Sequence, residues 1–146
     1  NSTPIMLGYQ AEGAAPFIQG SRVYNPETIA TAIRIGNPQS WDQALKLSKE
    51  SNGWFDSFSD REILATQKML TEKEGIFCEP ASAISVAGAL RDIKSGKIPD
   101  GSSVVCTLTG HGLKDPDTAI AQCDPSAMIN VNPTLEEVKK AILNNM

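Results

Sequence analysis

The clearest candidate for a binding residue is Thr109, which directly follows the apolar run at residues 104–108 and precedes Gly110, His111 and Gly112. A threonine hydroxyl can donate a hydrogen bond to a ligand atom or accept one from it. The glycines beside it leave room for a flat ring. The same residues also suit a simple turn in which the threonine bonds its own backbone, and on these residues alone that turn is the commoner structure.

Three other places in the sequence carry a weaker signal for binding. His111 is the only histidine and could act as a general base, although an exposed turn residue is the commoner role. Glu79 precedes Pro80 at a helix start, where its carboxylate suits the helix dipole and could also face a ligand. The small residues at 10–16 let a backbone approach a ligand closely, and they equally well make turns.

Composition excludes several classes of function. The chain has 146 residues, of which 40% are hydrophobic and 21% are charged, and this suits one globular domain with a real core. A net charge of −4 without a basic stripe argues against nucleic acid, and no apolar run is long enough to span a bilayer. Three widely spaced cysteines and one histidine predict neither a disulfide framework nor a metal site, and they favour a reducing, cytoplasm-like compartment.

Hydrophobic periodicity and capping signals divide the chain into alternating strands and helices. Ser59 and Glu62 form a capping-box pattern, and glycines follow several of the predicted helices. The predicted strands are 5–9, 54–58, 76–78, 103–108 and 127–131, and the predicted helices are 26–36, 38–50, 60–74, 80–94 and a last amphipathic helix after Asn132 or Thr134.

This alternation predicts an α/β fold with a mostly parallel, twisted sheet and flanking helices. Residues 103–108 have the strongest strand pattern, because their centre is continuously apolar, as in parallel strands covered on both faces. Ligands of such sheets bind outside the carboxyl ends of the strands. Thr109 is expected at such an end.

Four segments, taken in order, resemble the C-terminal part of the threonine synthase family, whose members are pyridoxal-phosphate enzymes of the tryptophan-synthase-β type. They are GYQAEGAAP at 8–16, PETIATAIRIGNP at 26–38, FCEPASA at 77–83 and LTGHGLKDP at 108–116. The resemblance covers nearly the whole chain from Gly8 to about Ala121. An ordered set of matches is more specific than any one of them.

The resemblance implies the C-terminal part of a two-domain, fold-type II enzyme with pyridoxal 5'-phosphate as cofactor. Such lyases make threonine and phosphate from O-phospho-L-homoserine and water, by β,γ-elimination and β-addition of water. A threonine at the place of Thr109 bonds the pyridine nitrogen in relatives, with Gly110 beside it. By the same resemblance, Ala11, Glu12 and Gly13 would line the face of the cofactor, and Glu79 would lie near its edge.

The resemblance also implies that essential parts lie elsewhere. The family's Schiff-base lysine and its phosphate-cradling loop belong to an N-terminal segment, so no catalytic residue is assigned here, and the isolated chain is expected to be inactive. Lys114 matches the Lys-Asp-Pro turn of the family and is not expected to bond the cofactor. The expected partners are the missing N-terminal half and O-phosphohomoserine, a homodimeric parent stays open, and the location is cytoplasmic, or plastid in a plant.

Under this reading residues 1–125 belong to the catalytic region, and 126–146 form a C-terminal strand and helix extension. Two alternatives remain. One is another lyase of the same cofactor fold, such as a serine or threonine dehydratase, which the ATAIRIGNP run at 30–38 disfavours. The other is a stand-alone, non-catalytic domain that binds a partner.

Overall fold

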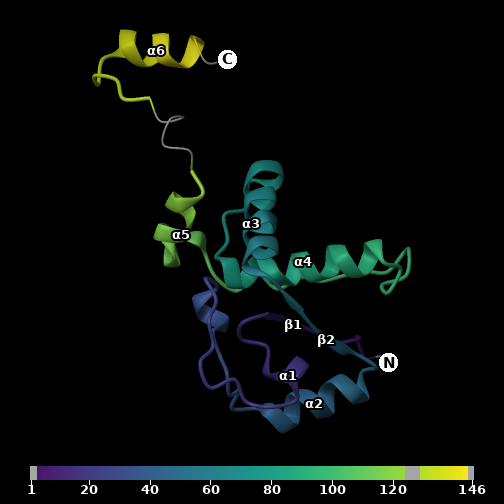
Figure 1. Ribbon diagram of the computed structural model, residues 1–146. Coiled ribbons are helices and arrows are strands. Elements are labelled where there is room, and N and C mark those ends of the chain that lie inside the picture. The colour runs from purple at the N-terminus through teal and green to yellow at the C-terminus, as the bar shows by residue number, and fades with distance from the viewer. Residues whose placement is uncertain (1–2, 124–128, 145–146) are drawn as a thin grey trace. The chain divides into compact units, whose positions relative to one another are not determined.

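A computed structural model describes residues 3–123 and 129–144 (Figure 1). The chain divides into two compact units, Asn1–Asp115 and Pro116–Met146, which we call the N-terminal and the C-terminal unit. The proposed functional boundary at residue 125 is a separate matter and stays a prediction.

The N-terminal unit is built on a two-stranded parallel sheet. Strand β1 (Leu7–Ala11) pairs with β2 (Trp54–Phe58), in a register that sets Leu7 opposite Trp54 and Ala11 opposite Phe58. The predicted strand at 54–58 is confirmed, and the one at 5–9 is present but lies two residues further along. Parallel strands need a crossover connection, and that connection holds the α2 helix (Trp41–Glu50). The predicted α/β class with flanking helices is confirmed.

Helices cover both faces of this sheet. Helix α4 (Pro80–Lys94) packs on one face together with α3 (Asp60–Glu74), whereas α2 and the short helix α1 (Pro16–Gln19) lie on the other, as Figure 1 shows. The main core consists of small and apolar side chains from β1, β2, α3, α4 and the crossover: Ala11, Ala30, Phe58, Ile63, Ile84 and Ala87. A second cluster consists of Leu70, Cys78 and Ala83.

Close packing between α4 and β1 depends on a glycine. A Cβ atom at Gly88 would overlap the ring of Tyr9, so only glycine leaves room for this ring against the helix. On the opposite face of the sheet, the Phe17 ring stacks on Phe55 with centroids 4.4 Å apart and also contacts Trp41 at 4.8 Å. Aromatic packing of this kind stabilises a small sheet that has few strands to support it.

Local sequence signals define α3 as expected. The Ser59 hydroxyl accepts a hydrogen bond from the Glu62 backbone, the Glu62 carboxylate accepts one from the Ser59 backbone, and Gly75 ends the helix in the left-handed conformation. The Ser59 hydroxyl holds the pKa of Glu62 below its ordinary value, because its hydrogen bond favours the charged carboxylate.

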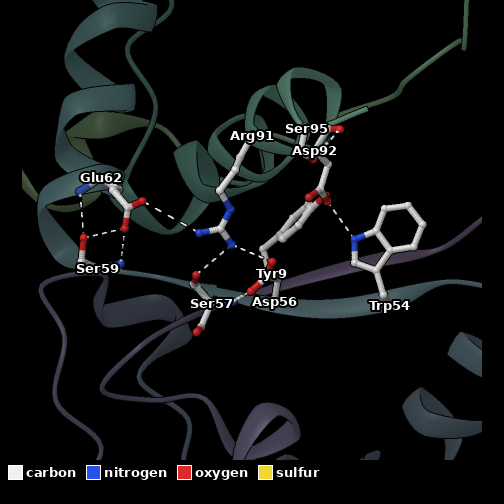
Figure 2. Close-up of polar contacts among 9 residues, drawn as sticks. All are labelled: Tyr9, Trp54, Asp56, Ser57, Ser59, Glu62, Arg91, Asp92 and Ser95. Carbon is white, nitrogen blue, oxygen red and sulfur yellow. Dashed lines mark hydrogen bonds and ion pairs between the residues drawn. The ribbon is translucent and has the colours of Figure 1, made fainter. Parts of the chain in front are cut away.

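The last turn of α4 is fixed to the sheet by a polar network (Figure 2). Arg91 forms an ion pair with Asp56 at 2.8 Å and lies over the Phe58 ring at 3.6 Å. The next residue, Asp92, is buried and accepts hydrogen bonds from the Tyr9 hydroxyl at 2.6 Å and the Trp54 indole at 2.8 Å. Two adjacent residues therefore connect one helix end to both strands.

The predicted helix at 26–36 is wrong. Only Thr31–Ile33 form one 3₁₀ turn, η1, and the rest is irregular. Several hydrogen bonds of this segment run to other parts of the unit. Asp60 accepts from the Thr28 hydroxyl and from the Ile29 backbone, and the Glu27 backbone donates to the Gly13 carbonyl. These tertiary bonds replace the helical ladder that the Asn-Pro-Glu start predicts.

Two predicted strands are also wrong. Residues 103–108 run extended along α4 but form no ladder, and the exposed fraction of Val105 is 91%. The physical reason is that no strand among the described residues lies alongside this segment to pair with it. The segment at 76–78 contributes only one isolated bridge, between Cys78 and His111.

The C-terminal unit contains helix α5 (Pro116–Ala121), which is not among the helices predicted from the sequence, and helix α6 (Leu135–Leu143). The predicted last helix is confirmed, and its N-cap is Thr134, whose hydroxyl accepts from the Glu137 backbone. Of the predicted strand at 127–131, residues 127 and 128 lie outside the described residues, and 129–131 form no strand. Within the described ranges, none of the helices has the length and apolarity that crossing a bilayer requires.

Candidate functional site

The extended segment that ends at Thr109 is aligned by α4. The Ser85 hydroxyl lies 3.4 Å from the Thr107 carbonyl, and the Ser82 hydroxyl lies 3.1 Å from that of Thr109. The segment therefore runs antiparallel to α4. So does β1, because Tyr9 contacts the end of α4, while Ala11 shares a core cluster with Ile84 and Ala87 from its first half. Thr109 and Ala11 consequently both lie toward the N-terminal end of α4.

The turn after Thr109 is held by backbone bonds to the residues that precede α4. The Gly110 carbonyl accepts from the Glu79 backbone at 3.0 Å, and the Gly112 backbone donates to Phe77 at 3.0 Å. A Cβ atom at Gly110 would overlap the Glu79 carboxylate, and one at Gly112 would overlap the Phe77 ring. These two glycines are therefore needed for the close approach of the turn to α4.

Glu79 is a buried carboxylate beside this turn. Its side chain is 5% exposed and pairs with the amino group of Lys114 at 3.2 Å. The structure thus brings Glu79, Thr109 and Gly110, all predicted site residues, into one cluster. Lys114 belongs to the 3₁₀ turn η2 (Gly112–Lys114), and its amino group is directed to Glu79. This pairing agrees with the expectation that Lys114 does not bond a cofactor, which itself stays a prediction.

His111 acts in the turn as a cap. Its Nδ1 atom accepts a hydrogen bond from the Leu113 backbone at 3.1 Å, and its ring meets Phe77 edge to face with centroids 5.5 Å apart. An Nδ1 atom that accepts leaves the hydrogen of a neutral imidazole on Nε2. These two contacts give His111 a structural role in the turn.

The other predicted site residues, Ala11, Glu12 and Gly13, form the tight turn after β1. Ala11 is fully buried in the core, whereas Glu12 and Gly13 are exposed. The Glu12 backbone donates to Phe58 and the Gly13 carbonyl accepts from Glu27, each at 2.9 Å. Among the described residues no hydrogen bond or ion pair joins these three residues to Thr109, so the structure leaves two separate groups near one end of α4.

Ser82 is the residue of this site that sequence reasoning missed. Its side chain is buried, and its hydroxyl lies within hydrogen-bond distance of Thr109 and of the Gly110 backbone. The signal that could have identified it is its position three residues after Glu79, on the same face of the predicted helix.

The cysteines of this unit offer no activated nucleophile. Burial raises the pKa of the Cys78 thiol and also that of the Cys106 thiol, so both stay protonated at neutral pH. All three cysteines, including Cys123 in the C-terminal unit, are free thiols. The groups that remain for binding are the exposed Thr109 hydroxyl and the small-residue turn after β1. They can hold and orient a ligand, and the ionisable side chain among them is the exposed carboxylate of Glu12.

Comparison with known proteins identifies the family. A family model described as pyridoxal-phosphate dependent enzyme matches residues 1–110. The chain is 52% identical to a threonine synthase of Synechocystis sp. over 139 residues, 52% identical to one of Halalkalibacterium halodurans over 132 residues, and 44% identical to one of Methanosarcina acetivorans over 150 residues. These alignments cover 95%, 90% and 97% of the chain, and in each case the chain spans 36% of the length of the curated relative.

Among solved structures, a threonine deaminase of T.th. is similar to this chain, with a TM-score of 0.50 and 20% sequence identity. The match covers 60% of this chain and 34% of that one. At this level of sequence identity the similarity supports a shared fold and nothing more. The family model covers most of the sequence, and the chain belongs to the pyridoxal-phosphate dependent enzyme family.

Proposed function

We propose that this chain is the C-terminal part of a threonine synthase, a lyase of threonine biosynthesis that converts O-phospho-L-homoserine and water to L-threonine and phosphate. The observation that carries the proposal is the 52% identity to a threonine synthase over 95% of the chain. The dehydratase alternative has less support, because the threonine deaminase shares only 20% of its sequence with this chain.

The residues of the site fit one part of the cofactor. Thr109 offers an exposed, neutral hydroxyl held by the buried Ser82, which suits the ring nitrogen of pyridoxal phosphate. Glu12 and Gly13 lie in an exposed turn near the same end of α4, where the glycine would let the backbone approach the cofactor closely. When bound, the cofactor supplies an electron sink for negative charge at the substrate carbons. In this proposal the chain orients the ring, and Gly110 and Glu79 hold the turn that presents Thr109.

The proposed partner is the N-terminal part of the same enzyme, which corresponds to the part of the relatives that this chain does not cover. It would supply the lysine and the phosphate-binding loop that the family resemblance assigns to the N-terminal segment. The exposed apolar segment at 103–108 supports this, since Val105 is 91% and Val104 is 40% exposed, and its backbone forms no ladder with any strand of the described residues. A cytoplasmic location is part of the proposal, supported by three free thiols.

The test is an assay of the full-length enzyme that contains this chain, loaded with pyridoxal 5'-phosphate. We expect phosphate and L-threonine in equal amounts from O-phospho-L-homoserine, and no oxo acid from L-threonine or L-serine. Oxo acid formation with no phosphate release would instead support the dehydratase.

The isolated chain is the companion experiment. We expect it to be inactive and to gain activity when the N-terminal part is added as a separate polypeptide. Failure of the full-length enzyme with every one of these substrates would favour the non-catalytic, partner-binding alternative.

A further inference from the structure

Ser82 carries a buried hydroxyl that must satisfy its hydrogen bonds locally. It lies in the first turn of α4, and its exposed fraction is 1%. Four polar atoms surround its Oγ: the Gly110 nitrogen at 2.9 Å, Thr109 Oγ1 at 3.1 Å, and the Gly110 carbonyl oxygen and Glu79 Oε1, each at 3.5 Å. A hydroxyl has one hydrogen to donate and two lone pairs to accept with.

The position of the Ser82 hydrogen follows from these distances. A backbone N–H can only donate, so the Gly110 nitrogen occupies one lone pair of Ser82. Thr109 Oγ1 is the nearest acceptor, at 3.1 Å, while the two oxygens at 3.5 Å lie beyond the usual O–H···O distance.

Both of the distant oxygens also have better donors. The Gly110 carbonyl accepts from the Glu79 backbone at 3.0 Å, and the Glu79 carboxylate pairs with Lys114 at 3.2 Å. Thr109 Oγ1 is therefore the acceptor that the Ser82 hydrogen reaches most easily.

We propose that Ser82 is a positioning residue that makes Thr109 a hydrogen-bond donor toward the bound ligand. Once Thr109 Oγ1 accepts from Ser82, its own hydrogen is directed away from α4, to the exposed side of the segment. The site then prefers a ring nitrogen with a free lone pair to a protonated one. This inference rests on the proposed function, because the ligand is the ring of the cofactor.

The opposite arrangement has a distinct chemistry. If Thr109 donated to Ser82 and Ser82 donated to Glu79, Thr109 would present only lone pairs and would favour a protonated ring nitrogen. The Lys114 amino group, which neutralises Glu79, weakens the attraction that would drive this arrangement. The two arrangements therefore differ in the protonation state of the bound ring.

The experiment uses the full-length enzyme reconstituted with pyridoxal 5'-phosphate labelled with ¹⁵N in the ring. The variants are Ser82→Ala, Thr109→Val and the double variant, with Ser95→Ala as the matched control. Ser95 caps the far, C-terminal end of α4, and its hydroxyl donates to the Asp92 carbonyl at 3.1 Å. Circular dichroism checks that each variant is folded.

We expect the ¹⁵N shift of an unprotonated, hydrogen-bonded ring nitrogen in the unmodified enzyme. Ser82→Ala should weaken cofactor binding about threefold to tenfold, the effect of one lost hydrogen bond. Ser95→Ala should leave the affinity unchanged. In the Thr109→Val background, Ser82→Ala should have no further effect, because Ser82 acts through Thr109.

A pyridinium shift in the unmodified enzyme would overturn the inference, as would effects of Ser82→Ala and Thr109→Val that simply add. If Thr109→Val alone changes neither the affinity nor the ¹⁵N shift, then Thr109 does not bind the cofactor, and that part of the proposed function fails instead. Should Ser82→Ala not fold, Ser82→Cys keeps the shape with a weaker donor and should bind the cofactor with intermediate affinity.

Discussion

Replacing Asp92 with alanine should destabilise the N-terminal unit, because it breaks the polar network at the end of α4. One carboxylate oxygen, Oδ2, accepts hydrogen bonds from both Tyr9 and Trp54, which lie on different strands (Figure 2). The Asp92 side chain itself is buried, whereas those two side chains are half-buried. Asp92→Ala would leave a phenol and an indole without their acceptor, and would leave a small cavity.

The size of the effect can be estimated from these contacts. An unsatisfied buried donor costs about 1–3 kcal/mol, and the lower part of that range applies here because water can reach two half-buried rings. The loss is then about 3 kcal/mol for the two donors. Alanine is a better helix former than aspartate by roughly 0.5 kcal/mol, and removing a negative charge from the last turn of α4 gains about 0.5 kcal/mol more. The net loss in the free energy of unfolding is about 2 kcal/mol.

Urea unfolding of the chain, followed by circular dichroism, measures this loss. Asp100→Ala is the matched control, because Asp100 is exposed in the turn that follows α4, and it should change the free energy of unfolding by less than about 0.5 kcal/mol. If Asp92→Ala behaves like that control, the network does not hold α4 to the sheet and the reasoning is refuted.

The same network predicts a loss of stability at alkaline pH. Burial, followed by the hydrogen bond to Asp92 and its charge, raises the pKa of Tyr9 well above its ordinary value of 10.0. The folded state therefore keeps a proton that the unfolded state loses above about pH 10, so stability falls as the pH rises through that value. In Asp92→Asn the charge is gone but the burial remains, so the fall should end at a lower pH and be smaller in total. A fall of equal extent in both proteins would contradict the assignment to Asp92.

Two further predictions concern single ion or cap contacts. Glu62→Gln should lower the free energy of unfolding by about 0.5–1 kcal/mol at pH 7. The hydrogen bonds from Ser59 lower the pKa of Glu62 in the folded state, so this stabilisation is present above its unfolded pKa near 4.5 and is lost as the pH falls through the folded value. Urea midpoints of the two proteins should therefore converge as the pH falls below the folded value, and a constant gap would argue against the cap. Lys114→Met should cost roughly 1–3 kcal/mol, between the values for exposed and buried ion pairs, because it leaves the buried Glu79 carboxylate without its cation. The double variant with Glu79→Gln should recover part of that loss in the same urea assay, and equal losses in the single and double variants would refute the pairing.

Elements with strong local signals could be predicted from the sequence. Helix α3 has its capping box and its C-terminal glycine, α4 has Pro80 in its first turn, and Thr134 caps α6, so local residues determine each start. Strand β2 alternates, with Trp54 and Phe58 directed toward the α4 face. In each case the local hydrogen-bonding pattern and the tertiary packing favour the same structure.

The irregular crossover could not be predicted in this way, because distant residues determine it. Asn25 and Pro26 form a valid helix start, but Asp60, about thirty residues further along the chain, binds Thr28 and Ile29 instead. The carboxylate is available because Asp60 begins α3 and needs no partner of its own helix. A single sequence contains no sign of such a pairing.

The candidate site was predictable only in part for a similar reason. Thr109 and Glu79 lie next to glycine and proline signals, which identify the turn and the helix start. The link between them, Ser82, looks like an ordinary small residue of a helix facing a sheet. Its role depends on the antiparallel run of 103–109 along α4, which no local pattern specifies.

The extended segment at 103–108 and the candidate site at Thr109 are structurally coupled. Residues 103–108 direct one edge to α4 through Ser85 and expose Val105 on the other side, and the same segment ends at Thr109. Under the proposed function, a strand from the rest of the enzyme would pair with this segment and bury Val105. Pairing would also restrict the backbone that leads to Thr109. Binding of the N-terminal part should therefore stabilise the fold and at the same time hold the Thr109 hydroxyl in place. Both effects depend on the same extended segment at 103–108.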